Sequence, residues 1–310
     1  MARKKIIILL FLLFLLTAAC VRLAAITHKN AEEKFENFTE PDSAFHFADE
    51  ILPPDKNPAK FSCANDFLRA NISDISDTGH LLLVNLEHPL IAVPEFDTMA
   101  EAWPAVPVKA IDGIRLHPSA LEAAAALFEA AAEAEAGMFY VSSGYRSFDE
   151  QAELYSGGSN GYALPPGCSE HHTGLAIDIM ASGVSQQALG NSPQGKWLEK
   201  NAHRFGLILR YPDGARHITG VPYEPWHFRF VGLPHSLFMF ENGMVFEEYI
   251  NFLRQYGRVE IELDGKTFAA VYTEATNGTI NVPAGTDFFV SSDNTGNYIV
   301  TWLLLNENGK

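Results

Sequence analysis

The alternation of apolar and polar residues predicts a mixed region of helices and strands, followed by a region of strands alone. The most regular pattern runs from Pro118 to Glu135, an Ala- and Glu-rich stretch with Gly137 just beyond its end. Proline at the first helical position and glycine after the last are typical of a helix. Apolar residues at helical spacing predict its buried stripe, formed by Leu121, Ala124, Ala125 and Phe128.

Shorter segments complete the predicted core of the mixed region. Strands are expected where short apolar or alternating runs occur, and helices where longer amphipathic runs occur. The expected strands are 81–84, 138–142, 174–180, 207–211 and 226–230, and the further expected helices are 148–155, 195–205 and 246–255. Because side chains alternate along a strand, Gly174, Ala176 and Asp178 are expected to share one face.

The character of the chain changes after Tyr256. Val259, Ile261 and Leu263 alternate with glutamates, and the dipeptide that follows, at 264–265, is Asp-Gly, a strong signal for a hairpin turn. Further strands are expected at 279–282, 288–291 and 298–305. We therefore expect a small all-β appendage over residues 257–310, whose role its sequence does not reveal.

Residues 1–26 are expected to be a targeting segment and not a part of the folded domains. Basic residues at positions 3–5 precede an uninterrupted apolar run over residues 6–21, and this arrangement predicts export of everything that follows. Sixteen helical residues span about 24 Å, between the length of a signal-peptide core and that of a helix crossing a hydrocarbon layer of about 30 Å. We expect a protein at the extracytoplasmic face of the membrane or secreted, with cleavage, lipidation at Cys20 and retention all open.

Composition narrows the classes of function. A chain of 310 residues with 47% hydrophobic and 19% charged residues is typical of a folded protein with one sizeable core and an appendage. Its formal net charge of −16 argues against a nucleic-acid partner, since binding phosphates requires a basic surface. Three cysteines do not form a disulfide framework, and Cys63 and Cys168 either pair or are unrelated.

Two segments, 169–178 and 222–232, carry the residues of a metal site. A hydrolytic zinc ion takes three protein ligands and keeps its fourth position for water. We expect His171, Asp178 and His227 to be the three ligands, and a fourth from Cys168 would close the site. Glu224, three residues before His227, is the expected general base for the water. The competing interpretation is a surface hydrogen bond between His171 and Asp178, with Glu224 exposed and a half-buried Trp-His pair at 226–227 packing against a core.

Arg146 is the next candidate for a catalytic role, because it lies shortly after the predicted strand 138–142, beyond the sequence Ser-Ser-Gly. A positioned guanidinium stabilises the oxyanion that forms when an amide is hydrolysed, and Gln151 lies about one helical turn further on. The competing interpretation is a solvated surface charge. His172 neighbours an expected ligand, and adjacent side chains on an extended chain point opposite ways, so we expect it to support a ligand or to be exposed.

Together these segments resemble the VanY-type D-alanyl-D-alanine carboxypeptidase family of zinc metallopeptidases. The family pattern S-x-H-x-x-G-x-A-x-D falls on residues 169–178, E-x-W-H on 224–227, and Y-R followed by Gln on Tyr145, Arg146 and Gln151. The resemblance covers about residues 81–249. It implies an α+β fold of the D,D-peptidase and Hedgehog-like kind, in which a small antiparallel sheet flanked by helices holds one Zn²⁺. It places the substrate against Ser143, Tyr145, Gln151, Ser169 and Trp226.

The resemblance implies removal of the terminal D-alanine from peptidoglycan stem peptides. An L,D-carboxypeptidase acting on tetrapeptide stems stays open, since relatives with that activity share nearly the same motifs. A non-catalytic, zinc-containing wall-binding module is the alternative from another class. The expected domains are a signal peptide or anchor at 1–26, a stalk at 27–78, a zinc carboxypeptidase domain at 79–256 and the β appendage at 257–310. One departure is His172, where relatives often carry Gln.

Overall fold

The computed structural model describes residues 67–91, 100–101, 109–111, 113–156 and 162–304. The expected targeting segment, most of the expected stalk and Cys63 therefore lie outside the described residues. Among the helices of the described part, none combines the length and the apolarity needed to cross a membrane.

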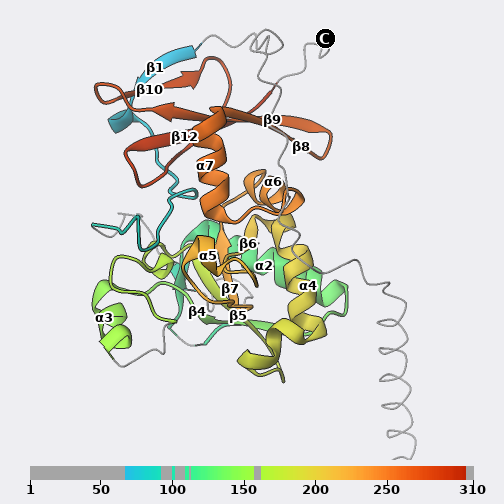
Figure 1. Ribbon diagram of the computed structural model, residues 1–310. Coiled ribbons are helices and arrows are strands. Elements are labelled where there is room, and N and C mark those ends of the chain that lie inside the picture. The colour runs from blue at the N-terminus through green and yellow to red at the C-terminus, as the bar shows by residue number, and fades with distance from the viewer. Residues whose placement is uncertain (1–66, 92–99, 102–108, 112, 157–161, 305–310) are drawn as a thin grey trace, which may run out of the picture. The chain divides into compact units, whose positions relative to one another are not determined.

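Four antiparallel strands form the sheet of the main domain, in the order β4-β5-β7-β6 (Figure 1). They are β4 (Phe139–Ser143), β5 (Ala176–Ala181), β7 (His227–Phe230) and β6 (Leu207–Leu209). The pattern predicted all four, with ends displaced by one or two residues. A two-stranded pair, β2 (Ala100–Glu101) and β3 (Arg115–Leu116), stands apart from this sheet.

Helix α2 (Pro118–Glu133) covers one face of this sheet and provides much of its core. Leu121 and Ala124 are fully buried, as expected, whereas Ala125 and Phe128 pack on the same core while partly exposed. The other helices are α3 (Phe148–Ser156), α4 (Pro193–Asn201), α5 (Arg216–Thr219), α6 (His235–Glu241) and α7 (Phe246–Tyr256). Short 3-10 helices are η2 (Ile72–Asp74), η3 (Glu170–Thr173), η4 (Gln186–Asn191) and η5 (Ala202–Phe205).

The alternation in β5 separates the core from the face that carries polar groups. Ile177 and Ile179 are fully buried in the same cluster as the α2 residues. Because successive side chains of a strand point to opposite faces, Asp178 between them is directed away from this core. Asp178 is the one β5 residue that is not fully buried.

The prediction of a strand at residues 81–84 was wrong. Leu81 and Val84 are buried, but the segment is irregular. Nη2 of Arg229 donates to the carbonyls of His80 and Leu82, at 3.1 and 2.9 Å. A side chain therefore satisfies these carbonyls in place of the backbone of a neighbouring strand. A short apolar run predicts burial, and it cannot tell a buried strand from a buried loop.

The C-terminal strands form a second antiparallel sheet, in the order β11-β12-β9-β8. They are β8 (Arg258–Leu263), β9 (Lys266–Glu274), β11 (Phe288–Ser292) and β12 (Asn297–Leu303). Asp264 and Gly265 join β8 to β9 with positive φ angles of 51° and 71°, the conformation of the expected hairpin turn. Strand β10 (Thr279–Pro283) pairs instead with β1 (Phe67–Asn71), which lies in the stretch expected to be a stalk.

The second sheet shares a hydrophobic core with α7. Phe246 and Ile250 of the helix cluster with Ile261 of β8 and Ile299 of β12. On the polar side of this contact, buried His235 meets Tyr249 Oη through Nδ1 at 2.6 Å and Thr301 Oγ1 through Nε2 at 3.2 Å. A small sheet that buries its apolar face on a neighbouring helix gains the core it lacks by itself.

Acid is expected to weaken the fold through His235, because burial lowers its pKa from 6.5 to about 3. The unfolded chain takes up this proton near pH 6.5, so between these values the unfolded state binds more protons. The free energy of unfolding therefore falls as the pH falls through this window, by up to about 1.4 kcal/mol per pH unit. Urea unfolding of metal-free protein at several pH values measures the slope. His235→Asn should reduce the slope, to which partly buried His80 and His203 also contribute, and an unchanged slope would contradict the assignment.

Candidate metal centre

The potential metal ligands come from two neighbouring strands and the short helix before one of them. Strands β5 and β7 are antiparallel, and their register places Asp178 opposite His227. His171 lies in η3, which precedes β5. Gly174 ends η3 with a φ of 67°, a left-handed conformation that glycine adopts without steric cost. This turn lets His171 fold back over the start of the strand.

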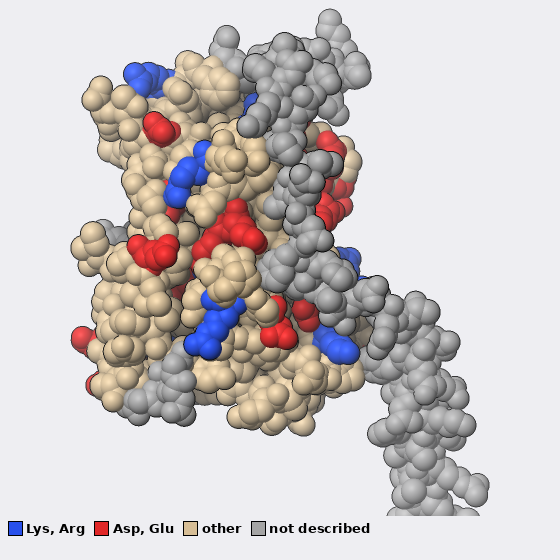
Figure 2. Space-filling model, in the orientation of Figure 1, with Lys and Arg blue, Asp and Glu red and all other residues tan. Residues whose placement is uncertain are grey.

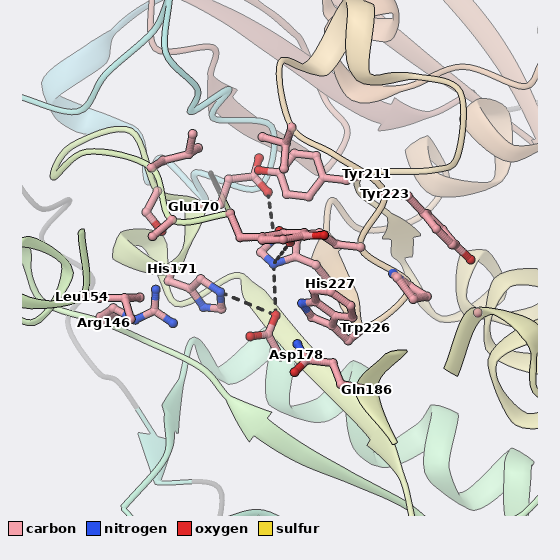
Figure 3. A pocket seen from close by; sticks show the side chains of 18 of the residues that line it. Arg146, Leu154, Glu170, His171, Asp178, Gln186, Tyr211, Tyr223, Trp226 and His227 are labelled. Carbon is pink, nitrogen blue, oxygen red and sulfur yellow. Dashed lines mark hydrogen bonds and ion pairs between the residues drawn. The ribbon is translucent and has the colours of Figure 1, made fainter. Parts of the chain in front are cut away.

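The three side chains converge on one point (Figure 3). Nδ1 of His227 lies 3.0 Å from Oδ1 of Asp178, and Nε2 of His171 lies 3.6 Å from the same oxygen. One ligand atom from each residue lies within 4.8 Å of the other two. The structure therefore brings together the three ligands expected from the sequence, and Cys168, a buried free thiol, is not a member of the group.

This donor set fits a zinc ion. Nδ1 of His171 donates to the carbonyl of Gly144 at 2.7 Å, which leaves the Nε2 lone pair directed at Asp178. Two imidazole nitrogens and one carboxylate oxygen are ligand types that zinc takes in catalytic sites, where a further position is kept for water. The imidazole planes are nearly perpendicular, at 87°, so each ring can approach a shared ion from its own direction.

The electrostatics of the three residues favour a cation. Burial by itself would raise the pKa of Asp178, but His171 and His227 outweigh it and hold that pKa well below its usual range. Burial lowers the pKa of His171. Burial opposes protonation of His227 too, but the carboxylates of Asp178 and Glu170 raise its pKa to about 9. A metal ion binds the neutral imidazole, so its binding displaces this proton.

Glu224 is held beside the three ligands by the backbone. Its N–H donates to the carbonyl of Tyr211, and its carbonyl accepts from the N–H of His227, both at 3.1 Å. Its Oε2 lies 3.8 Å from Nδ1 of His227. Burial raises the pKa of Glu224 to about 7, despite the opposing effect of His227. A carboxyl group with such a pKa can accept and return a proton near neutral pH.

Arg146 lies after β4, with its guanidinium fixed by two side chains. Nη1 donates to Oε1 of Gln151 at 2.7 Å, and Nη2 donates to Oγ of Ser143 at 3.0 Å. The backbone N–H of Arg146 donates to the carbonyl of His171 at 3.1 Å. Ser143 and Gln151, which the sequence analysis placed against the substrate, therefore hold Arg146 in position.

The part of the chain that carries this geometry is similar to known proteins named D-alanyl-D-alanine carboxypeptidase. Residues 113–233 match the model of the family described as "VanY: D-alanyl-D-alanine carboxypeptidase". A D-alanyl-D-alanine carboxypeptidase of Enterococcus faecium is 43% identical over 164 residues, covering 53% of this chain and 53% of the relative. One of Enterococcus faecalis is 36% identical over 188 residues, covering 55% and 65%.

Solved structures agree. The vancomycin-resistance D,D-dipeptidase VanXYg, in complex with a D-Ala-D-Ala phosphinate analogue, aligns with a TM-score of 0.65 at 27% identity, covering 77% of this chain and 99% of that one. The LD-carboxypeptidase LdcB aligns with a TM-score of 0.51 at 33% identity, covering 56% and 86%. The chain belongs to the VanY family. The chain spans about half the length of the curated relative from E. faecium.

In this VanY-family chain the site opens into a cavity of about 680 Å³. Of the residues expected to contact substrate, Gln151, Ser169 and Trp226 line it. Ser143 and Tyr145 are not among the described residues that line it, and Tyr145 instead packs beneath the guanidinium of Arg115, 4.8 Å away. The sequence analysis missed other lining residues: Leu154, Tyr162, Gln186 and Tyr223.

Charged side chains of both signs lie scattered over the face of the molecule drawn in Figure 2. On the face drawn in Figure 2, Lys and Arg side chains lie apart from one another, separated by neutral and acidic surface. A phosphate backbone is bound by basic side chains that follow its path. The visible described surface thus carries scattered charges of both signs.

His172 is buried and ties two parts of the VanY-type site together. Its Nδ1 donates to the carbonyl of Arg146 at 2.7 Å, and its Nε2 accepts from the N–H of Gly167 at 3.0 Å. The ring stacks on Phe148 with centroids 4.2 Å apart. The expectation that His172 could be exposed is therefore wrong, and its side chain contacts Arg146, Gly167 and Phe148.

Glu170 is the functional candidate that the sequence analysis missed. It is fully enclosed between His227 and two arginines, Arg210 and Arg229. Its one sequence signal is its place directly before a ligand, at the start of the segment Glu-His-His. That signal is weak, because the arginines that make its burial tolerable are distant in the chain.

Proposed function

We propose that this protein is a zinc-dependent D,D-carboxypeptidase that removes the terminal D-alanine from peptidoglycan stem peptides, with one zinc ion per chain. The convergence of His171, Asp178 and His227 beside the buried carboxyl group of Glu224 carries the proposal. Membership of the VanY family supports the substrate class. The relatives from E. faecium and E. faecalis bear the name of this activity.

The proposed chemistry divides between the metal and this chain's own carboxyl group. Zinc, when bound by the three ligands, supplies Lewis acidity and lowers the pKa of water. Glu224 accepts the proton of the attacking water as the oxygen bonds to the amide carbon. As the C–N bond breaks, the carboxyl group of Glu224 gives that proton to the nitrogen of the departing D-alanine. The pKa of about 7 suits Glu224 to both transfers.

The guanidinium of Arg146 is proposed to face the oxyanion of the tetrahedral intermediate. Ser143 and Gln151 hold it at the cavity wall, so its charge needs no rearrangement during the reaction. A preorganised donor of this kind contributes most in the transition state. Ser169 and Trp226 are left to contact the substrate.

Arg146→Ala is expected to lower kcat by about 10²–10³-fold, the usual effect of losing one oxyanion donor, with zinc content unchanged. Steady-state kinetics with metal analysis of the same samples tests this. Arg146→Lys keeps the charge but loses the two-pronged hydrogen bonding. Its kcat should lie between that of the natural protein and that of Arg146→Ala. Loss of zinc from Arg146→Ala would show instead that the residue supports η3.

An L,D-carboxypeptidase is the second candidate, favoured by a specific observation. The structure of the LD-carboxypeptidase LdcB aligns at 33% identity over 56% of this chain. The reacting groups serve either activity equally, because both cleave an amide bond before a terminal D-residue. The distinction lies with the cavity wall, which Tyr162 and Tyr223 line.

We further propose that the protein acts outside the cytoplasm, tethered by residues 1–26 or secreted. The basic residues before an apolar run support this proposal, as does a substrate class that belongs to the wall. Residues 79–256 would then be the carboxypeptidase domain and 257–310 its β appendage. Of the proposed stalk, 27–78, residues 67–71 form strand β1 on that appendage.

Mass spectrometry of stem peptides incubated with the full-length protein in mild detergent tests the function. A pentapeptide losing one alanine, only when zinc is present, is the expected result. Trimming of the tetrapeptide alone would show an L,D-carboxypeptidase in which the same residues have the same roles. If zinc-loaded protein cleaves neither peptide, a non-catalytic wall-binding module becomes the favoured function.

A further inference from the structure

A buried glutamate lies behind His227, on the side away from Asp178. Oε2 of Glu170 is 3.6 Å from Nε2 of His227, and Figure 3 shows the two carboxylates on opposite sides of the ring. Glu170 is 1% exposed. Within the described part of the chain, neither Oε2 of Glu170 nor Nε2 of His227 has a hydrogen-bond partner. Since leaving such atoms unpaired is costly, a small closing movement would pair them with each other.

The other carboxylate oxygen of Glu170 has a separate task. Oε1 accepts from Nε of Arg210 at 2.8 Å and from Nη1 of Arg229 at 3.1 Å. Both arginines are fully buried. Because both buried guanidiniums pair with Oε1, Oε2 of Glu170 is left to face His227.

A carboxylate at Nε2 decides which nitrogen of His227 faces the site. A neutral imidazole carries one N–H and one lone pair, and the acceptor beside one nitrogen makes that nitrogen the donor. With the proton on Nε2, the lone pair of His227 is on Nδ1, which lies 3.0 Å from Oδ1 of Asp178. A metal ligand must offer this lone pair, and an acceptor on its other nitrogen raises its basicity.

We propose that Glu170 is a positioning residue of the metal centre, which accepts the Nε2–H of His227 and so presents Nδ1 to the cation. The carbonyl of Gly144 performs the equivalent task for His171, at 2.7 Å from its Nδ1. Each imidazole of the site thus has an acceptor on its far side. The inference deepens the proposed function and rests on its zinc ion.

The same network contains a matched control. Arg210 also donates to both carboxylate oxygens of Glu247 in α7, at 2.9 and 2.6 Å. Glu247 is buried and in turn accepts from Nδ2 of Asn85 at 3.1 Å. Within the described part of the chain, the carboxylate of Glu247 makes no hydrogen bond or ion pair with His227. Glu170→Gln and Glu247→Gln therefore each remove one negative charge from beside Arg210, and the former alone alters the partner of His227.

The decisive measurement is the zinc affinity of the two variants in the full-length protein, by competition with a fluorescent chelator. Circular dichroism and urea unfolding first establish that each is folded. Glu170→Gln is expected to bind zinc about 10- to 100-fold more weakly, the range for groups that orient metal ligands. Glu247→Gln is expected to lose stability and to keep its zinc affinity within about threefold. Equal losses of affinity, or none in Glu170→Gln, would overturn the proposal.

A second variant covers failure of Glu170→Gln to fold. Glu170→Asp keeps the negative charge between the arginines but withdraws the carboxylate from His227, so weaker zinc binding by folded protein is again expected. In zinc-loaded protein labelled with ¹⁵N-histidine, the Nε2 proton of His227 should exchange with solvent faster in this variant than in the natural protein. Unchanged exchange together with unchanged affinity would reject the role.

The outcomes for the natural protein separate this inference from the function on which it rests. If the natural protein does not bind zinc, the zinc site is refuted, and both the proposed function and the proposed role of Glu170 are wrong. If zinc binds tightly but no stem peptide is cleaved, the carboxypeptidase proposal falls. The comparison of Glu170→Gln with Glu247→Gln still decides the role of Glu170 in that case, because its readout is affinity.

Discussion

Glu224→Gln is expected to retain zinc and to lower kcat for release of D-alanine by about 10²–10⁴-fold, the usual contribution of a positioned general base. The amide matches the carboxyl group in shape but cannot accept the proton of the attacking water. The carboxyl group of Glu224 has the required position, 3.8 Å from Nδ1 of His227, and a pKa raised by burial to about 7. Stopped assays by mass spectrometry, with zinc content measured in parallel, test the result.

Glu241→Gln is the control for this substitution. It makes the same chemical change at an exposed residue of α6, away from the cavity, so full turnover is expected. Two results would count against the role of Glu224. Unchanged turnover in Glu224→Gln would remove it as the base, and loss of zinc would make it a support for the ligands.

Asp178→Asn is expected to weaken zinc binding by more than the roughly 10- to 100-fold typical of groups that only orient ligands, and turnover should fall with it. Asp178 supplies the one negative charge among the three ligands, and both imidazoles approach the same oxygen, at 3.0 and 3.6 Å. The amide keeps an oxygen at this place but not the charge. Equilibrium dialysis against buffered zinc measures the loss.

Chelation of the natural protein should have the same effect, and added zinc should reverse it. Asp213→Asn, at an exposed position, provides the charge-matched control and should keep both zinc and activity. Full activity after thorough chelation would refute the metal-dependent chemistry as a whole. Normal zinc binding by Asp178→Asn would leave the two histidines in need of a different third ligand.

Much of the local structure was predictable because its causes are local. Helix α2 is specified by proline at its start and apolar residues at helical spacing, and the structure places it at Pro118–Glu133. The turn at Asp264-Gly265 is likewise a property of two adjacent residues. The apolar run at 81–84 shows the limit, because the carbonyl of Leu82 accepts from Arg229 and that of Leu83 from Asn294, both more than a hundred residues away.

The sequence by itself determined the family to which the motif spacing belongs, and it predicted the ligand types and a base three residues before His227. Only the tertiary structure decided which nitrogen of His227 faces the site. That choice depends on the register of β5 and β7, which sets Asp178 on one side of the ring. It also depends on a buried glutamate whose ionisation requires Arg210 and Arg229. Burial of such a charge is settled by contacts between distant segments, and a local pattern carries no record of them.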